Sequence, residues 1–279
     1  MREIRQEVLS GERAFYGESG AKLYDCVFCG GESAVKECSD LEINSSIFEW
    51  KYPVWYSKNI TIDGCSFLKD CRAGFWYIDD LTIRNSVIDA PKCVRRCSGV
   101  NLENVSFTNG DETLWACCGA RLKNINAKGS YFAMNCSDME VDGLKLVGGY
   151  SFDGVKNVVV RNSTIVGRDV FWNSENVTVY DSFLTGEYLA WNSKNVTFVN
   201  CTIESLQGLC YMDSLVMKNC RLINTTLAFE YADVDAEITG TIDSVFNPKS
   251  GTIRADRIAE LTVDKSRVDP SKTKIICKN

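Results

Sequence analysis

The chain has 279 residues, of which 45 % are apolar and 24 % are charged, and its net charge is −6 at pH 7. This acidic balance disfavours nucleic acid and anionic membranes as partners, and no apolar run approaches the ~20 residues of a membrane span. The absence of histidine excludes Ser-His-Asp and Cys-His catalysis and any histidine-based metal cluster. No glycine-rich phosphate loop follows a strand pattern. We therefore predict no cofactor, no metal, no nucleic acid and no membrane contact.

Residues 1–13 are rich in charge and lack the apolar stretch of a secretory signal, so we expect a cytoplasmic protein. A repeat begins directly after them. We expect residues 1–13 to cap the first coil of this repeat, because the open end of a solenoid exposes apolar faces and strand edges.

A polar residue or glycine returns every 19 to 21 residues along most of the chain. These marker positions are Asp25, Ser45, Gly64, Asn85, Asn104, Asn124, Gly143, Asn162, Asp181, Asn200, Asn219 and Gly240. A constant period of this size is typical of a solenoid. Each period is rich in Val, Ile, Thr, Phe and Asn and shows no helical periodicity, which favours short strands over the helical limb of a leucine-rich repeat.

The simplest fold with this pattern is all-β: a single-stranded right-handed parallel β-helix of about twelve coils of 19–21 residues with capped ends. We predict a single domain over 1–279, with an N-terminal cap at 1–13, regular coils at 14–242, and irregular final coils with a C-terminal cap at 243–279. Asn and Gly tolerate the left-handed backbone of tight corners, so the markers are expected at corners. Stacked asparagines could then hydrogen-bond to one another.

Fourteen cysteines are spread along the chain, and many share a repeat position with serine. Cys26, Ser46, Cys65 and Ser86 fall in one column, which Ser163, Ser182, Cys201 and Cys220 continue, and Ser57, Cys97, Cys117, Cys136, Ser174 and Ser193 fall in another. Interchange of cysteine with serine indicates small buried side chains, so we predict reduced thiols in the core and a reducing compartment. The alternative is a metal site made by Cys93, Cys97, Cys117, Cys118 and Cys136, which lacks the paired spacing of zinc ligands.

A large aromatic residue occurs about once per coil. The positions are Trp55, Trp76, Trp115, Phe152, Trp172, Trp191, Tyr211 and Phe229, with Arg95 and Met134 in the two coils that lack one. Two places before Trp172 and Trp191 stand the aliphatic Val170 and Leu189. Strand alternation puts such pairs on one face, which favours aromatic side chains that stack inside the core. The alternative is an outward stripe on which sugar rings stack.

The turns before this strand carry the candidate catalytic groups. Neighbouring coils bring equivalent side chains within about 5 Å, so Asp153, Asp169 and Glu187 could gather carboxylates for acid–base chemistry on a glycoside. Arg95 and Arg96 are candidate anchors for an acidic sugar. The other candidate ligand-binding residues are Trp172, Asn173, Tyr188, Trp191, Asn192 and Glu230. The alternative is that these charges are solvated at the corners, and a one-residue change of register would move them to the opposite face.

Several long segments resemble one bacterial family. They read Gly-Glu-Arg-Ala at 11–14, Phe-Glu-Trp-Lys-Tyr-Pro-Val-Trp-Tyr at 48–56, Arg-Ala-Gly-Phe-Trp-Tyr at 72–77, Ala-Pro-Lys at 90–92, Glu-Thr-Leu-Trp at 112–115, Tyr-Phe-Ala-Met-Asn at 131–135, Gly-Glu-Tyr-Leu-Ala-Trp-Asn-Ser at 186–193 and Thr-Leu-Ala-Phe-Glu-Tyr at 226–231. On these segments the chain resembles the DUF3737 family, uncharacterised β-helix proteins of the pectin-lyase-like superfamily. The resemblance implies the fold and no catalytic residue. The chain lacks the Gly-His-Gly signature of polygalacturonase-like enzymes, so the carbohydrate chemistry of the superfamily is an analogy only.

Two hypotheses about function follow. In the first, the protein binds an intracellular oligosaccharide, or acts on it as a hydrolase, lyase or isomerase. In the second, it is a non-catalytic β-helix scaffold for protein–protein interaction or self-assembly. The sequence does not decide whether the protein is an enzyme, and it gives no oligomeric state.

Overall fold

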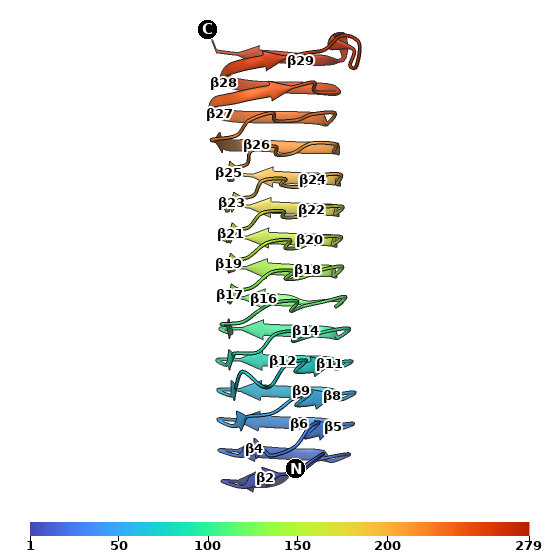
Figure 1. Ribbon diagram of the computed structural model, residues 1–279, viewed down its shortest axis with the longest axis vertical. Coiled ribbons are helices and arrows are strands. Elements are labelled where there is room, and N and C mark those ends of the chain that lie inside the picture. Colours follow the sequence, from blue (N-terminus) through green and yellow to red (C-terminus); the bar gives the residue numbers. More distant parts are fainter. Residues whose placement is uncertain (279) are drawn as a thin grey trace. The chain divides into compact units, whose positions relative to one another are not determined.

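The computed structural model describes residues 1–278. The described chain is an all-β parallel solenoid, as predicted, with one short 3-10 helix, η1 (Pro270–Lys272). Its internal contacts divide into two compact units, which we call unit 1 (Met1–Leu146) and unit 2 (Val147–Asn279). Within each unit, Figure 1 shows the strands as successive parallel rungs.

Unit 1 contains three parallel strand stacks. The first runs in the order β1 (Arg2–Arg5), β3 (Ser19–Tyr24), β6 (Ser39–Asn44), β9 (Lys58–Asp63), β12 (Asp79–Arg84), β14 (Ser98–Glu103), β16 (Arg121–Lys123) and β18 (Ser137–Asp142). The second runs in the order β2 (Val8–Ser10), β4 (Val27–Cys29), β7 (Ile47–Phe48), β10 (Ser66–Phe67), β13 (Val87–Ile88), β15 (Ser106–Phe107) and β17 (Asn126–Lys128). The third holds β5 (Val35–Lys36), β8 (Val54–Trp55) and β11 (Phe75–Trp76), and single bridges continue it through Arg95 to Trp115.

Unit 2 repeats the first two stacks, and β19 (Lys145–Val147) contains the boundary between the units. The first stack runs in the order β20 (Lys156–Arg161), β22 (Glu175–Tyr180), β24 (Lys194–Val199), β26 (Asp213–Ile223), β27 (Asp233–Phe246), β28 (Ser250–Thr262) and β29 (Thr273–Cys277). The second holds β21 (Thr164–Val166), β23 (Phe183–Thr185) and β25 (Thr202–Glu204), which pairs with the end of β26. Strands β26 and β27 are long because the strand pairing continues through their corners with a shift in register, whereas in the earlier coils the strand ends at the corner.

The described residues make about 15 turns, against about twelve expected. The difference arises at the two ends of the repeat. Strands β1 and β2 pair before the first marker, and β28 and β29 pair after the last one. These turns carry no recognisable marker residue, so the count of markers left them out, although irregular final coils were expected at 243–279.

The marker residues form the corners, as the sequence predicted. All twelve have a φ between +48° and +94°, the left-handed region that Asn, Asp and Gly tolerate best. The asparagines also form ladders. In unit 1 Asn104 Nδ2 donates to Asn85 Oδ1 at 3.1 Å, and in unit 2 Asn219 Nδ2 donates to Asn200 Oδ1 at 2.9 Å.

The core of each coil consists of small and aliphatic columns with stacked phenylalanines. In unit 1 the Phe48 ring stacks between Phe28 at 4.3 Å and Phe67 at 4.6 Å. Both predicted Cys/Ser columns are buried, and all fourteen cysteines are free thiols. Burial raises the pKa of the Cys65 thiol to about 11, which keeps it protonated. Among residues 1–278 no group of three or more cysteine and carboxylate side chains is arranged to hold a metal ion.

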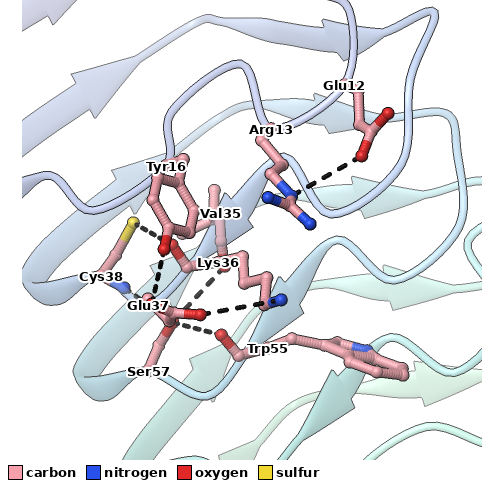
Figure 2. Close-up of polar contacts among 9 residues, drawn as sticks. All are labelled: Glu12, Arg13, Tyr16, Val35, Lys36, Glu37, Cys38, Trp55 and Ser57. Carbon is pink, nitrogen blue, oxygen red and sulfur yellow. Dashed lines mark hydrogen bonds and ion pairs between the residues drawn. The ribbon is translucent and has the colours of Figure 1, made fainter.

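Backbone groups inside the corners are satisfied by these small side chains. Figure 2 shows one such corner in unit 1, where the Ser57 hydroxyl accepts from Cys38 N–H at 3.2 Å and donates to the Trp55 carbonyl at 3.0 Å. On the outer side Tyr16 donates its hydroxyl to Glu37 at 2.7 Å. The Trp55 indole points away from Cys38 and Ser57 in the same view. Over the part of the chain that the structure describes, no helix is long and apolar enough to cross a bilayer.

Candidate functional site

The tryptophans are half-buried, and the expectation that these side chains point into the core was wrong. In unit 2 the segments before Trp172 and Trp191 do not alternate. Leu189 and Ala190 are both buried, whereas Trp191 is half-buried. Ala190 has a φ of +57°. A left-handed residue turns the chain, so that two consecutive side chains face inward and the third faces outward. Phe171, with a φ of +62°, has the same effect on Trp172.

The register also moves three of the predicted aromatic positions. Gly154 N–H donates to the Trp172 carbonyl at 2.7 Å, which puts Asp153 in the column of Trp172. At the other end of the column, Asn192 N–H donates to the carbonyl of Cys210, and Tyr211 N–H to the carbonyl of Glu230. The column therefore contains Asp153, Trp172, Trp191, Cys210 and Glu230, while Phe152 and Phe229 are buried and Tyr211 lies one place further on.

Unit 1 carries an outward column that we call the aromatic ladder, formed by Trp55, Trp76, Arg95 and Trp115. The rings of Trp55 and Trp76 stack in parallel, with centroids 5.0 Å apart and an interplanar angle of 5°. The Arg95 guanidinium follows in the same stack, 5.3 Å from the Trp76 centroid and 4.9 Å from that of Trp115. Each ring face in the middle of the ladder is therefore covered by its neighbour.

The two predicted sugar anchors, Arg95 and Arg96, differ in what already holds them. Arg95 is ion-paired with Glu112, which also lies 3.4 Å from Lys92. Arg96 is exposed and lies 5.9 Å from the ring centroid of Tyr77. Among residues 1–278, Arg96 makes no ion pair. The positive charge of Arg95 is thus already balanced, whereas that of Arg96 is not.

Unit 2 carries a different arrangement, which we call the aromatic cluster: Trp172, Tyr188, Trp191, Tyr211 and Tyr231. Trp191 meets Trp172 at 6.2 Å and 68°, Tyr188 at 5.0 Å and 67°, and Tyr211 at 5.0 Å and 55°. Rings that meet at such angles do not cover each other's faces as parallel rings do. The Trp191 Nε1–H donates to the Gln207 carbonyl at 2.7 Å, so the part of this indole that faces solvent is carbon.

Polar side chains border the aromatic cluster. Asn173 and Asn192 each follow a tryptophan at a left-handed corner, and Asn192 Nδ2 donates to Asn173 Oδ1 at 2.6 Å. Glu230 is half-buried. Burial raises the pKa of its carboxyl group, and the positive charge of Arg267 partly opposes this increase. The predicted candidates Trp172, Trp191, Tyr188, Asn173, Asn192 and Glu230 therefore all lie in unit 2, on or beside the cluster.

The three predicted carboxylates also lie in unit 2 and interact electrostatically, Asp153 with Asp169 and Asp169 with Glu187. Glu187 is half-buried and pairs with Arg168 at 3.0 Å. Asp153 is half-buried and accepts a hydrogen bond from Trp172 N–H at 3.3 Å. Burial raises the pKa of Asp153 to about 7; the nearby Asp169 charge contributes to this and the Trp172 N–H opposes it.

Asp169 is the most enclosed of these groups, with 2 % of its surface exposed. Its Oδ1 is buried and has no hydrogen-bond partner. Burial raises the pKa of this carboxyl group and Glu187 adds to the effect, while Arg168 opposes it. An ionised oxygen without a partner is costly in this position, which agrees with the raised pKa of this carboxyl group.

Sequence reasoning missed the polar groups next to Tyr231. A depression of about 420 Å³ is lined by Tyr231, Asp233, Lys249, Ser250, Arg267, Val268, Asp269 and Lys272. Arg267 donates to the Tyr231 hydroxyl at 3.4 Å. Column alignment could have found Tyr231, which takes the corner position after Glu230. Arg267 lies outside the regular repeat, and nothing in the pattern marks it.

The fold and the aromatic surfaces define the class of protein: a parallel β-solenoid with half-exposed aromatic columns on its outer face. The family is also clear. The chain belongs to the DUF3737 family, whose model matches residues 2–276 and is described as a protein of unknown function. A comparison with curated proteins found no significant match.

Solved β-solenoids resemble the chain only distantly. A tailspike protein of an E. coli bacteriophage, solved with a hexasaccharide, is 10 % identical with a TM-score of 0.34; the match covers 94 % of this chain and 65 % of the tailspike, so the chain spans less than two thirds of its length. A periplasmic alginate epimerase is 9 % identical with a TM-score of 0.39, covering 92 % of this chain and 76 % of the epimerase. A mannuronan C-5 epimerase module of Azotobacter vinelandii is 12 % identical with a TM-score of 0.33, covering 94 % and 89 %. Likeness at this level carries no inference about function.

Proposed function

We propose that unit 2 binds an oligosaccharide across the aromatic cluster. The observation that carries the proposal is the outward, half-exposed position of Trp172 and Trp191, whose rings meet at 68° instead of stacking in parallel. A pyranose ring has an apolar face of C–H groups with hydroxyls around its edge. It therefore matches an aromatic surface that is bordered by hydrogen-bonding groups.

The border of the cluster supplies such groups. The amides of Asn173 and Asn192 and the carboxyl of Glu230 lie beside the rings. The Trp191 indole N–H is used by Gln207, so a ligand meets the carbon surface of this ring and finds its polar partners around it. The net charge of −6 argues against a nucleic acid, which would also stack on aromatic rings.

The aromatic ladder of unit 1 fits this role less well. Its middle ring faces are covered by each other and by Arg95, whose charge is balanced by Glu112. We therefore propose no ligand contact for Arg95. Arg96 keeps an unbalanced charge, and we propose it as a separate anchor in unit 1 for the carboxylate of an acidic sugar.

A thermal-shift screen tests the proposal. The panel contains cello-, xylo-, manno- and chito-oligosaccharides and oligogalacturonides, each of four to six units. A ligand that binds only the folded protein raises the melting temperature by mass action. Tryptophan fluorescence then gives the dissociation constant of each panel member that binds.

The Trp191→Ala variant is expected to weaken this binding by about tenfold or more, because a stacking surface worth about 1.4 kcal/mol is lost. The matched control is Trp50→Ala, which removes another exposed indole outside both aromatic columns; its affinity should equal that of the wild type. Equal affinity of Trp191→Ala and the wild type would contradict the proposal. A screen without any hit would favour the scaffold hypothesis instead.

A further inference from the structure

The aromatic cluster of unit 2 continues into a depression that the proposed function leaves unassigned. Trp191 meets Tyr211 at 5.0 Å, and Tyr211 meets Tyr231 at 5.4 Å. Tyr231 also lines the depression of about 420 Å³, together with Arg267 and Lys272. A chain of sugar rings that lies along the cluster toward Tyr231 therefore reaches the depression.

We propose that this depression binds a carboxylate of an acidic oligosaccharide, with Arg267 and Lys272 as the residues that recognise it. This inference rests on the proposed binding of an oligosaccharide to the aromatic cluster. It names the class of sugar, one that carries uronic acid units, and the residues that select it over a neutral sugar.

The two cations have few partners within the protein. Arg267 contacts the Tyr231 hydroxyl and the Asp264 carboxylate, each at 3.4 Å, which is long for a hydrogen bond between nitrogen and oxygen. A guanidinium group has five N–H donors, so most of the donors of Arg267 are available to a ligand. Lys272 is exposed and makes no ion pair with any of residues 1–278.

The acids that line the depression are held by partners of their own. Asp233 accepts from the Ser250 hydroxyl and from Lys249, whose ammonium group lies at 2.9 Å. Asp269 accepts from the Ser271 N–H at 3.0 Å and from the Ser271 hydroxyl at 2.7 Å. The unmet hydrogen-bonding capacity of the depression therefore belongs to its two remaining cations, and it favours an anion.

Arg267 is also held in place by a tight turn. Asn247 Oδ1 accepts from Asp264 N–H at 2.7 Å. The Asp264 carbonyl in turn accepts from Arg267 N–H at 2.9 Å and from Val268 N–H at 3.0 Å, and Val268 is buried. A cation whose backbone is fixed in advance loses less conformational freedom when a ligand binds.

Two acids near Arg267 limit the attraction of charge alone. Asp264 Oδ2 faces the guanidinium group, and the carboxyl group of Glu230 interacts with it electrostatically. Recognition of an anion therefore needs direct hydrogen bonds. A carboxylate offers two oxygens to the fork of a guanidinium group, whereas a sugar hydroxyl offers one uncharged oxygen. This difference favours the acidic sugar over the neutral one.

The test compares two pairs of oligosaccharides of four to six units. The first pair is oligogalacturonides and their methyl esters, and the second is cello-oligosaccharides oxidised to the carboxylate at C6 and their parent chains. In fluorescence titrations of the wild type, the acid of at least one pair should bind about tenfold more tightly than its neutral partner, because it gains charge-assisted hydrogen bonds.

The variants assign this preference to the two cations. Arg267→Gln and Lys272→Gln should each reduce the ratio of affinities to about threefold, and the double variant to about one. Affinity for the neutral partner should not change. The matched controls are Arg257→Gln and Lys274→Gln, which remove exposed cations of unit 2 that do not line the depression. Both controls should keep the wild-type ratio.

Nitrogen-15 NMR of the arginine Nε–H groups gives a second readout, which locates the bound acid. The Arg267 resonance is assigned by its absence in Arg267→Gln. It should shift when the acidic oligosaccharide is added to the wild type and stay in place with the neutral partner. Melting curves check that these exposed substitutions leave the fold intact.

The outcomes separate the two proposals. Equal affinity for acid and neutral partner in both pairs overturns this inference, and so does an acid preference that survives in the double variant or is lost equally in the controls. Each of these results leaves binding to the aromatic cluster standing if Trp191→Ala still weakens it. Absence of binding by every oligosaccharide overturns both proposals.

Discussion

The tryptophans of the aromatic ladder in unit 1 and of the aromatic cluster in unit 2 occupy the same repeat position, and they differ in what covers their rings. In the ladder, Trp55 and Trp76 lie parallel at 5°, and Arg95 continues the stack. In the cluster, Trp172 and Trp191 meet at 68°. Parallel rings cover each other's faces, and this stacking stabilises the coil. The tilted rings of the cluster do not cover each other in this way, and our proposal places a ligand on them.

The charged residues of the two columns differ in the same sense. In unit 1 the coil without an aromatic ring has Arg95, which is stacked on both sides and paired with Glu112. In unit 2 the corresponding position holds Asp153, whose pKa is raised to about 7 by burial. The repeat therefore fixes the direction of a side chain, and the partners of that side chain decide whether it is structural or available for chemistry.

The largest expected effect concerns the core beneath the two surfaces, which should be equivalent. Phe75 lies under the ladder and Phe171 under the cluster, and both are fully buried. Phe75→Ala and Phe171→Ala are each expected to cost about 3–5 kcal/mol of unfolding free energy, because each leaves a cavity in a packed core. Denaturant unfolding followed by circular dichroism measures both. A loss below about 1 kcal/mol in one variant alone would show that the two cores are built differently.

The next effect should separate the two surfaces. Trp76→Ala removes a ring that stacks on Trp55, contacts Arg95 and donates Nε1–H to the Lys92 carbonyl at 2.8 Å. We expect a loss of about 2–3 kcal/mol in stability and no change in ligand affinity. Trp172→Ala should lose less stability than Trp76→Ala but should bind the ligand about tenfold more weakly than the wild type. Melting curves and fluorescence titrations of both variants give the four values. The comparison fails if both variants lose the same stability and the same affinity.

A loss of stability between about pH 4 and pH 7 is expected from Asp153 of unit 2. The pKa of Asp153 is raised from 3.8 to about 7, so the folded state keeps a proton that the unfolded state has released. Stability is therefore expected to fall as pH rises from about 4 through about 7. One pKa unit corresponds to about 1.4 kcal/mol, which gives a ceiling of about 4 kcal/mol, and solvent at this half-buried group reduces the expected loss to about 1–2 kcal/mol.

Melting temperatures at pH 5 and pH 8 measure this effect. Asp153→Asn keeps an oxygen that can accept from Trp172 N–H but has no proton to lose. Its stability relative to the wild type should therefore rise between the two pH values. The control Asp235→Asn, which changes an exposed ion pair, should follow the wild type. Parallel curves for Asp153→Asn and the wild type would remove the basis for a raised pKa.

The solenoid and its corners could be predicted from the sequence because they depend on local chemistry. A residue such as Asn104 or Asn200 tolerates the left-handed conformation of a corner, and its side-chain amide can hydrogen-bond to the asparagine at the same position of a neighbouring coil. The carboxylates Asp153, Asp169 and Glu187 do not occupy equivalent repeat positions, since Asp153 shares a column with Trp172, so the repeat length alone does not predict how they lie.

The direction of Trp172 and Trp191 could not be predicted, because it depends on the backbone conformation of the residue before each of them. Phe171 and Ala190 adopt left-handed conformations that their side chains disfavour in isolation. These left-handed conformations are supported only by the packing of the whole coil, and no pattern of residue types in the sequence predicts them. The burial of Asp169 is unpredictable for the same reason, since it depends on how the preceding loop folds.

The smallest expected effect concerns the corners, where the two units should be alike although their outer surfaces differ. Asn104 donates to Asn85 and accepts from Asn124, and Asn200 donates to Asp181 and accepts from Asn219. Replacement of either by alanine should cost about 1–2 kcal/mol, because two side-chain hydrogen bonds are lost and alanine disfavours a φ near +55°.

Glycine separates the two contributions, since it removes the amide but adopts the left-handed conformation freely. Asn104→Gly and Asn200→Gly should therefore cost less than the alanine variants, and by the same amount in both units. Denaturant midpoints of the four variants measure this. If the glycine and alanine variants were equally unstable, the corners would depend on the asparagine ladder and not on backbone conformation. A difference between Asn104 and Asn200 would place the distinction between the units in the corners as well as in the aromatic columns.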